Sequence, residues 1–186
     1  MNCPDLSDAG RLTAGDRRLR LPGTAARLAL AALTLAACEF EARPPLSQTF
    51  GSPELAARAV LAAMAARNAD ALLDLAVDEH EFRRIVWPEL PASRPETGLP
   101  VEYAWGRLRL TSRSRLSMAL AEHGGHHYEL VAVKFRGETT RHRTFSVHRE
   151  TELVVRDASG ATQTVRLFGS LLERDGRWKV FSYVVD

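Results

Sequence analysis

The sequence predicts an α+β fold, in which N-terminal helices pack on a curved antiparallel sheet of about four strands. Apolar residues recur at helical spacing between residues 52 and 123, and they alternate with a period of two from His127 to the end of the 186-residue chain. Turn-forming stretches, "DASGA" and "RDGR", separate the alternating segments. Because the helices all precede the strands, the strands are expected to pair antiparallel.

The first 37 residues differ in composition from the rest of the chain. The basic cluster "RRLR" precedes an uncharged apolar run of ten residues, Leu28 to Ala37, that ends in small side chains. This order of charged, apolar and small residues is typical of an export signal. A membrane-spanning helix needs ~20 apolar residues, so this run is too short to be one. Residues 1–37 are therefore predicted to be a signal peptide.

The predicted signal ends on "LAAC", in which Leu35, Ala36 and Ala37 precede Cys38. This motif resembles the lipobox of bacterial lipoproteins. The resemblance implies cleavage before Cys38 and acyl chains on that residue, which together would anchor the protein to a membrane. Glu39 at the next position implies the outer membrane, facing the periplasm, if the cell has two membranes. The alternatives are an ordinary secretory signal or an apolar helix that contains a cysteine.

Removal of the signal would leave a chain with no net charge. The full sequence has 25 Lys+Arg and 23 Asp+Glu; residues 1–37 hold five and three of these, which leaves 20 of each. This balance predicts no basic face for a nucleic-acid partner. The cysteines are Cys3 and Cys38. Since the first would be removed and the second alkylated, we expect no disulfide in the mature protein. No motif predicts a cofactor.

A single domain is predicted over residues 52–186, preceded by a lipidated tether over residues 38–51. The first helix of this domain begins with Ser52 as N-cap and Pro53 at the first helical position, and Asn68 ends it.

Three more helices are expected before the strands. The second begins at Asp70, and the third begins at Asp78, which has the spacing of a capping box with Glu81. The fourth covers residues 101–123 and ends at Gly124. Its apolar stripe consists of Val101, Ala104, Trp105, Leu108, Leu116, Ala119 and Leu120. Leu110 and Met118 fall off this stripe.

The predicted strands cover residues 128–135, 144–155, 164–173 and 178–186. Apolar and polar residues alternate along the second of them, so one face is expected to be buried. The order of elements and the closing "ERDGRWKVFSYVVD" resemble the nuclear transport factor 2-like superfamily. In that family helices close the wide end of a bent sheet around a pocket, so the resemblance implies a cone-like domain. Its members include enzymes, ligand carriers and assembly modules, so this fold alone does not choose among them.

Histidines near the start of the first predicted strand are candidate metal ligands. The stretch "HGGHHYE" holds His123, His126, His127 and Glu129. If "GETT" forms a four-residue hairpin loop, Glu129 lies opposite His148 and near His127, and these three could bind zinc or another divalent ion. A register shift of one residue would separate them. Solvated loop and strand histidines are the alternative interpretation.

An acid or base in the expected pocket is a second candidate. His80 and Tyr103 lie on helices that would line or flank the pocket mouth, as do Glu81 and Asp74. Glu81 is also explained as a helix cap, and Asp74 as a solvated side chain. No nucleophile motif or phosphate-binding glycine loop occurs in the chain.

These observations predict a lipid-anchored cell-envelope protein that acts as a non-catalytic binding or assembly module. Its expected partners are the membrane, through Cys38, and a protein or a small hydrophobic ligand. The alternative is a small-molecule enzyme that uses acid and base residues of the pocket. A basic hairpin tip could also contact anionic lipid headgroups, although such residues more often protect a strand edge. These residues are Lys134, Arg136, Arg141 and Arg143.

Overall fold

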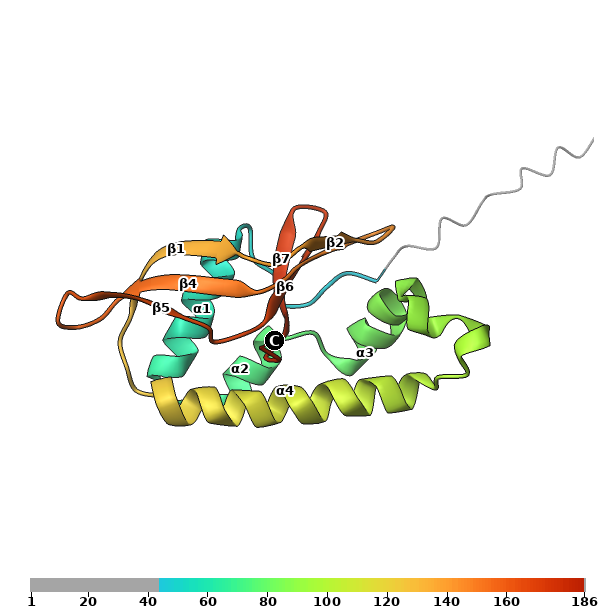
Figure 1. The fold of residues 1–186 in the computed structure, drawn as a ribbon, viewed down its shortest axis with the longest axis horizontal. Coiled ribbons are helices and arrows are strands. Elements are labelled where there is room, and N and C mark those ends of the chain that lie inside the picture. The colour runs from blue at the N-terminus through green and yellow to red at the C-terminus, as the bar shows by residue number, and fades with distance from the viewer. Residues whose placement is uncertain (1–43, 186) are drawn as a thin grey trace, which may run out of the picture. The chain divides into compact units, whose positions relative to one another are not determined.

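The computed structural model describes residues 44–185, which belong to one compact unit of the chain, Glu41–Asp186. The predicted signal peptide, residues 1–37, and Cys38 lie outside the described residues. The predicted α+β class is confirmed: helices come first and antiparallel strands follow (Figure 1). The α-helices are α1 (Pro53–Ala65), α2 (Ala69–Leu75), α3 (Glu79–Glu81) and α4 (Val101–His123). Short helical turns, η1 (Phe82–Val86) to η4 (Pro95–Thr97), connect α3 to α4.

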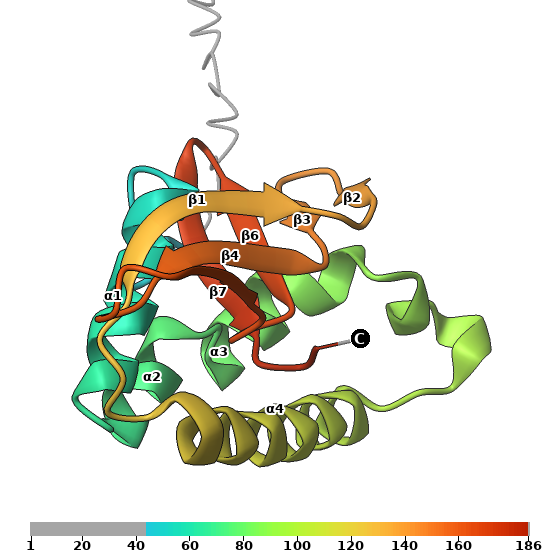
Figure 2. The same ribbon diagram turned by 60° about the vertical axis from the view of Figure 1, so that its left-hand side comes forward.

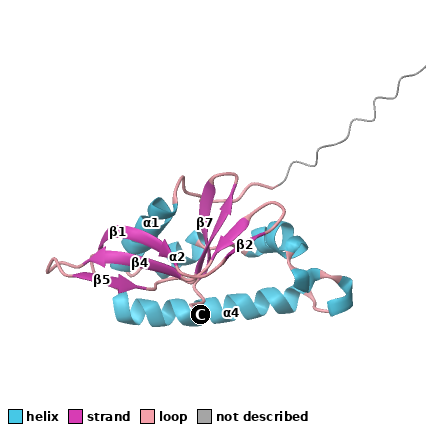
Figure 3. Cartoon of the chain, turned by 45° about the horizontal axis from the view of Figure 1, so that its top comes forward, coloured by secondary structure: helices cyan, strands magenta, loops and turns pink. Residues whose placement is uncertain are grey.

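Two antiparallel sheets take the place of the single sheet expected from the sequence. One has the order β1-β4-β5 and the other β2-β3-β6-β7. Figure 3 shows the strands of both sheets against the surrounding helices. The strands are β1 (Glu129–Phe135), β2 (Thr139–Arg141), β3 (Ser146–His148), β4 (Thr151–Arg156), β5 (Thr162–Val165), β6 (Ser170–Arg174) and β7 (Arg177–Ser182).

The count of about four strands was wrong because both central predicted strands are broken and because β2 forms in the loop predicted between the first two strands. Between β3 and β4 the chain turns at Glu150, whose φ of 51° belongs to the left-handed region. Between β5 and β6 the chain passes Gly169, which lies so close to the chain end that a Cβ there would be 1.6 Å from the carbonyl oxygen of Val184. Each break moves the chain from one sheet to the other. Within the first sheet, β1 is strongly bent (Figure 2). A cone-like outline remains a prediction.

Local hydrogen bonds explain where the helices begin. The Ser52 hydroxyl accepts from the amide of Leu55 at 3.2 Å, which confirms Ser52 as the N-cap of α1. The capping box of α3 is confirmed as well. The second helix begins at Ala69, one residue earlier than predicted, because the Asn68 side chain caps it by accepting from an amide at 3.0 Å. Asn68 thus starts α2 as well as following α1.

Helix α4 has the predicted bounds and the predicted buried face. It runs along the side of the domain opposite β1 and β2 (Figures 1 and 2). Ser112 and Leu116 are buried against the domain, whereas Leu110 and Met118, which fall off the apolar stripe, are 71% and 58% exposed. The helix therefore packs through one face only.

The described chain begins with a segment that is bound to the domain. The carbonyl of Pro44 accepts from Arg174 Nη1 at 2.9 Å, and Phe50 pairs with Trp178 of β7 through two 2.8 Å backbone hydrogen bonds. Residues 44–50 are therefore held against β6 and β7, with Phe50 as a single bridge to the edge strand β7. The predicted tether, residues 38–51, overlaps with this bound segment, so its described part is not a free spacer.

The apolar core consists of two neighbouring clusters. The larger lies between α1, α2, β1, β4 and the ends of β6 and β7, and its largest side chains are Phe168 and Tyr183. The smaller lies between η1, β3 and the first half of α4, and it includes Phe82 and Phe145. The faces of β3 and β4 that were predicted to be buried are buried, but each contributes to a different cluster. Among the described residues, no helix combines the length and the apolar composition needed to cross a bilayer.

Candidate functional site

A cavity of about 260 Å³ lies where α2, the start of α3, α4 and β7 meet. Its apolar wall consists of Leu73, Ala76, Val77, Trp105, Leu108 and Phe181. A buried cavity of ~150 Å³ holds one benzene molecule, and typical ligand sites begin near ~300 Å³. By this comparison the cavity suits a small ligand of about ten non-hydrogen atoms.

The polar groups that α4 brings to this cavity are hydrogen-bond donors. Arg109 and Arg113 line it and are exposed, and their guanidinium groups have no hydrogen-bond or ion-pair partner among residues 44–185. Ser112, between them, is 8% exposed, and its Oγ accepts from the amide of Tyr183 at 3.0 Å, which leaves its own proton for another acceptor. The buried indole Nε1–H of Trp105 has no acceptor in the described part of the chain.

The two carboxylates at the cavity are already engaged. Asp78 Oδ1 accepts from the amide of Glu81 at 2.8 Å as the cap of α3. Glu79 Oε1 lies 2.8 Å from Arg83 Nη2 in an exposed ion pair. Asp78 is bound by a neutral amide and keeps its negative charge, so the charges at the cavity without an ion-pair partner among the described residues are two positive ones, on Arg109 and Arg113, and one negative one.

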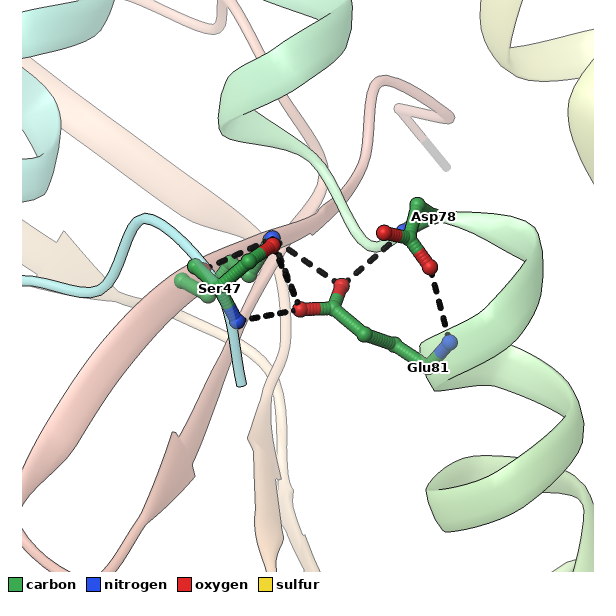
Figure 4. A network of polar contacts seen from close by, with 4 residues as sticks. Ser47, Asp78 and Glu81 are labelled. Atoms are coloured by element: carbon green, nitrogen blue, oxygen red, sulfur yellow. Dashed lines mark hydrogen bonds and ion pairs between the residues drawn. The ribbon is translucent and has the colours of Figure 1, made fainter. Parts of the chain in front are cut away.

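A buried ion pair lies directly behind the start of α3. Lys179 of β7 is 0% exposed and Glu81 is 2% exposed, and Lys179 Nζ lies 2.9 Å from Glu81 Oε2 and 3.0 Å from Oε1. Lys179 Nζ also donates to the Ser47 carbonyl and to Ser47 Oγ, both at 2.9 Å. Figure 4 shows how the carboxylate of Glu81 joins Ser47 and Asp78 at this point.

The ion pair fastens three distant parts of the chain together. Glu81 accepts from the Ser47 amide at 2.6 Å, from the Ser47 hydroxyl at 2.9 Å and from the Asp78 amide at 3.0 Å. Ser47 therefore gives its hydroxyl proton to a carboxylate and accepts from an ammonium group. A nucleophilic serine needs a base that is free to take that proton, whereas the Glu81 carboxylate is held by Lys179. The geometry indicates a structural clamp between residues 44–50, α3 and β7.

The predicted acid and base candidates do not meet at the cavity. His80 and Asp74 are exposed, Tyr103 is 57% exposed, and none of the three lines the cavity wall. Glu81 is the exception, because it lies beside the cavity, but its carboxylate is bound by Lys179. The residues suggested for an enzyme thus form no common site.

The assumed register of the metal trio was wrong. Glu129 lies opposite Arg156 of β4, with 3.0 Å between Oε2 and Nη1, and His148 lies opposite Thr139 of β2. The hairpin turns at His142–Phe145, where the His142 amide donates to the Phe145 carbonyl at 2.8 Å, and Thr139 and Thr140 of the expected "GETT" loop belong to β2. His127 and Glu129 line a second hollow, of about 590 Å³, beside α1. Among residues 44–185, no group of three or more His, Cys, Asp or Glu side chains is placed to hold a metal ion.

The other candidate residues of this region make contacts of their own. Nδ1 of His123 and of His126 lies 3.3 and 3.5 Å from the Tyr128 hydroxyl, respectively. On the basic hairpin, Arg136 pairs with Glu152 at 2.8 Å. Arg143, also on this hairpin, lies 3.8 Å from a carboxylate oxygen of Glu89. Lys134 and Arg141 are exposed.

His148 packs against two aromatic rings, Phe135 and Trp178, which also stack on each other with their centroids 6.0 Å apart. Its centroid is 4.9 Å from that of Phe135 and 4.7 Å from that of Trp178, and its Nε2 is buried without a partner among the described residues. Burial holds the pKa of His148 below its usual value, and the nearby charge of Arg141 adds to this effect while Glu173 opposes it. The folded protein therefore favours the neutral imidazole.

This burial predicts a pH-dependent stability. In the unfolded chain His148 has an ordinary histidine pKa near 6.5, so on acidification it is protonated at a higher pH than in the folded chain. The stability that comes from burying the neutral ring is therefore fully present above that pKa and is lost as the pH falls below it. We expect His148→Phe to flatten the fall in unfolding free energy on acidification from about pH 7.5 to about pH 5, measured by urea titration. His127→Phe, at an exposed position, is the control. An unchanged slope in His148→Phe would contradict the assignment.

Sequence reasoning missed the groups that define this site. Lys179 lies within the apolar strand "WKVFSYVVD", where a charged residue between Trp178 and Val180 looks like a solvated position. Arg109 and Arg113 look like the outer face of an amphipathic helix. One sequence signal was available. Lys179 shares a strand face with Phe181 among apolar residues, and a buried lysine needs a carboxylate partner.

We compared the chain with known protein families, curated proteins and solved structures. No protein-family model, no curated protein and no solved structure matches the chain.

Proposed function

We propose that the protein is a lipid-anchored cell-envelope module that binds a small hydrophobic ligand in the cavity between α2, α4 and β7. The observation that carries this proposal is the cavity itself: about 260 Å³, walled by apolar side chains, at the meeting point of both core clusters. Small-molecule sites are usually concave and apolar with a few placed polar groups. The nuclear transport factor 2-like resemblance, which implies a pocket between helices and a bent sheet, is in keeping with it.

The anchor half of the proposal rests on the "LAAC" motif at Cys38. An extended chain spans at most ~3.6 Å per residue, so the six residues from Cys38 to Pro44 reach about 20 Å. Pro44 is held on the domain by Arg174. An acylated Cys38 would therefore keep the domain close to the bilayer, in the bacterial envelope and, in a cell with two membranes, on the periplasmic side of the outer membrane.

Intact-mass measurement tests the anchor. Full-length protein expressed in a bacterium and purified from its membrane fraction is expected to have the mass of residues 38–186 plus acyl chains. The matched control, Cys38→Ser, is expected to lack the acyl mass and to leave the membrane fraction. Unmodified protein of full length, from the unsubstituted gene, would overturn lipidation.

Binding of an eight-carbon probe tests the cavity. Octan-1-ol is expected to change the fluorescence of Trp105, which lines the cavity, in a saturable way. Leu108→Trp fills the cavity and is expected to abolish binding, whereas Leu110→Trp, on the exposed side of the same helix, is expected to leave it unchanged. Binding is read by calorimetry in these variants, because they add a fluorophore. If neither octan-1-ol nor its charged analogues bind, the proposed function is wrong.

A further inference from the structure

We infer that the ligand of this cavity is a small amphiphile with an apolar body and a single anionic head, bound with its head at Arg109 and Arg113. This inference rests on the proposed function and names the class of molecule that the site would take. Three features of the described residues lead to it: the unpaired charge of two arginines, the donor groups of the α4 wall, and the burial of the apolar wall.

The unpaired charge belongs to two neighbouring side chains. Arg109 and Arg113 are four residues apart on α4, so they lie side by side on the helix, where like charges repel. No carboxylate among the described residues pairs with either of them. By contrast Arg83, near the same cavity, forms ion pairs with both Glu79 and Glu102, each with a nitrogen–oxygen distance of 2.8 Å. An anion between Arg109 and Arg113 would relieve this repulsion.

The polar groups of the α4 wall provide donors for such an anion. Guanidinium groups bind carboxylates through paired N–H groups and cannot accept a hydrogen bond. Ser112 accepts from the Tyr183 amide, and its hydroxyl proton remains available to donate to an anion. A head with several acceptor oxygens satisfies these donors, whereas a cationic head would meet two positive charges.

The apolar wall sets the orientation of the ligand. Leu73, Ala76, Val77 and Phe181 come from α2, the segment after it and β7, and they are buried or half-buried. Arg109 and Arg113 are exposed. The hydrocarbon part therefore lies inward, and the head stays at the mouth, where its charge keeps contact with water.

Three probes with the same chain separate the head from the body. We expect octanoate to bind roughly tenfold more tightly than octan-1-ol, since a charge-assisted hydrogen bond contributes about this factor. Octylamine is expected to bind more weakly than octan-1-ol. Affinities are measured by calorimetry and by Trp105 fluorescence at constant ionic strength.

Arginine variants locate the head. Arg109→Gln and Arg113→Gln are each expected to remove most of the preference for octanoate over octan-1-ol, while octan-1-ol still binds. The matched control is Arg107→Gln, an exposed arginine of the same helix that does not line the cavity.

The possible outcomes distinguish the two proposals. Equal binding of the three probes, or an octanoate preference that survives in both variants, overturns the inference about the head and leaves the proposed binding function in place. Absence of binding for all three overturns both. Loss of the preference in Arg107→Gln to the same extent would show a general charge effect of α4 and would overturn the assignment to Arg109 and Arg113.

Discussion

Replacement of Lys179 by methionine is expected to lower the free energy of unfolding by about 3–5 kcal/mol. Methionine fits the space of the lysine stem but removes the ammonium group, so Glu81 would be left as a buried charge without its cation. Lys179 is 0% exposed and Glu81 is 2% exposed, so water cannot replace the lost contacts without a rearrangement. Urea unfolding followed by tryptophan fluorescence measures the change.

An exposed lysine provides the control for this effect. Lys134→Met, at an exposed position of β1, is expected to change the unfolding free energy by less than about 0.5 kcal/mol. In a double variant, Glu81→Gln with Lys179→Met, the loss should be smaller than the sum of the two single losses, because neither partner leaves a charge behind. A loss below about 1 kcal/mol in Lys179→Met would contradict the role of the ion pair.

The same ion pair affects the cavity through α3. Glu81 accepts from the Asp78 amide, and Asp78 is part of the cavity wall. The clamp therefore holds one wall of the proposed ligand site as well as the first described segment of the chain. This coupling explains why a buried charge pair, which often stabilises little compared with apolar packing, occurs at this position.

Half of this clamp could be predicted from the sequence. The spacing of Asp78 and Glu81 indicates a capping box, because such a box depends only on residues three apart in the chain. The partner Lys179 is 98 residues away, and its contact with Glu81 depends on how β7 packs against α3. Contacts of this kind arise from tertiary packing and leave no local pattern.

The strands show the same difference between local patterns, which the sequence reveals, and tertiary contacts, which it does not. Alternation correctly predicts which residues of β3 and β4 are buried, since each pattern is local. It does not reveal the break at Glu150, because a left-handed residue other than glycine has no strong sequence signal. That break divides the hairpin between the two sheets, so that β4 pairs with β1 and β3 pairs with β2. The register assumed for the candidate metal trio was wrong for a different reason: the hairpin turns at His142–Phe145 and not at "GETT", which places Thr139 opposite His148.

Replacement of Gly169 by alanine is expected to be as damaging as the loss of the ion pair, with a decrease of about 4 kcal/mol or more in the free energy of unfolding. A Cβ at this position would lie 1.6 Å from the carbonyl oxygen of Val184 and 2.7 Å from its carbonyl carbon. These are backbone atoms, so no side-chain rotation can relieve the contact. The backbone would have to move where Gly169 accepts from Thr151 at 3.0 Å and donates to Ser182 at 3.2 Å.

Gly106→Ala is the matched control for this substitution. Gly106 lies in the interior of α4, and an added Cβ there meets no atom within 4 Å. Alanine is favoured over glycine in a helix, so this variant is expected to gain about 0.5–1 kcal/mol. Urea unfolding of both variants measures the contrast, and the yield of folded Gly169→Ala protein gives a second reading if the variant is too unstable to titrate. If Gly169→Ala unfolds within about 1 kcal/mol of the unsubstituted protein, the close approach of residues 169 and 184 is wrong.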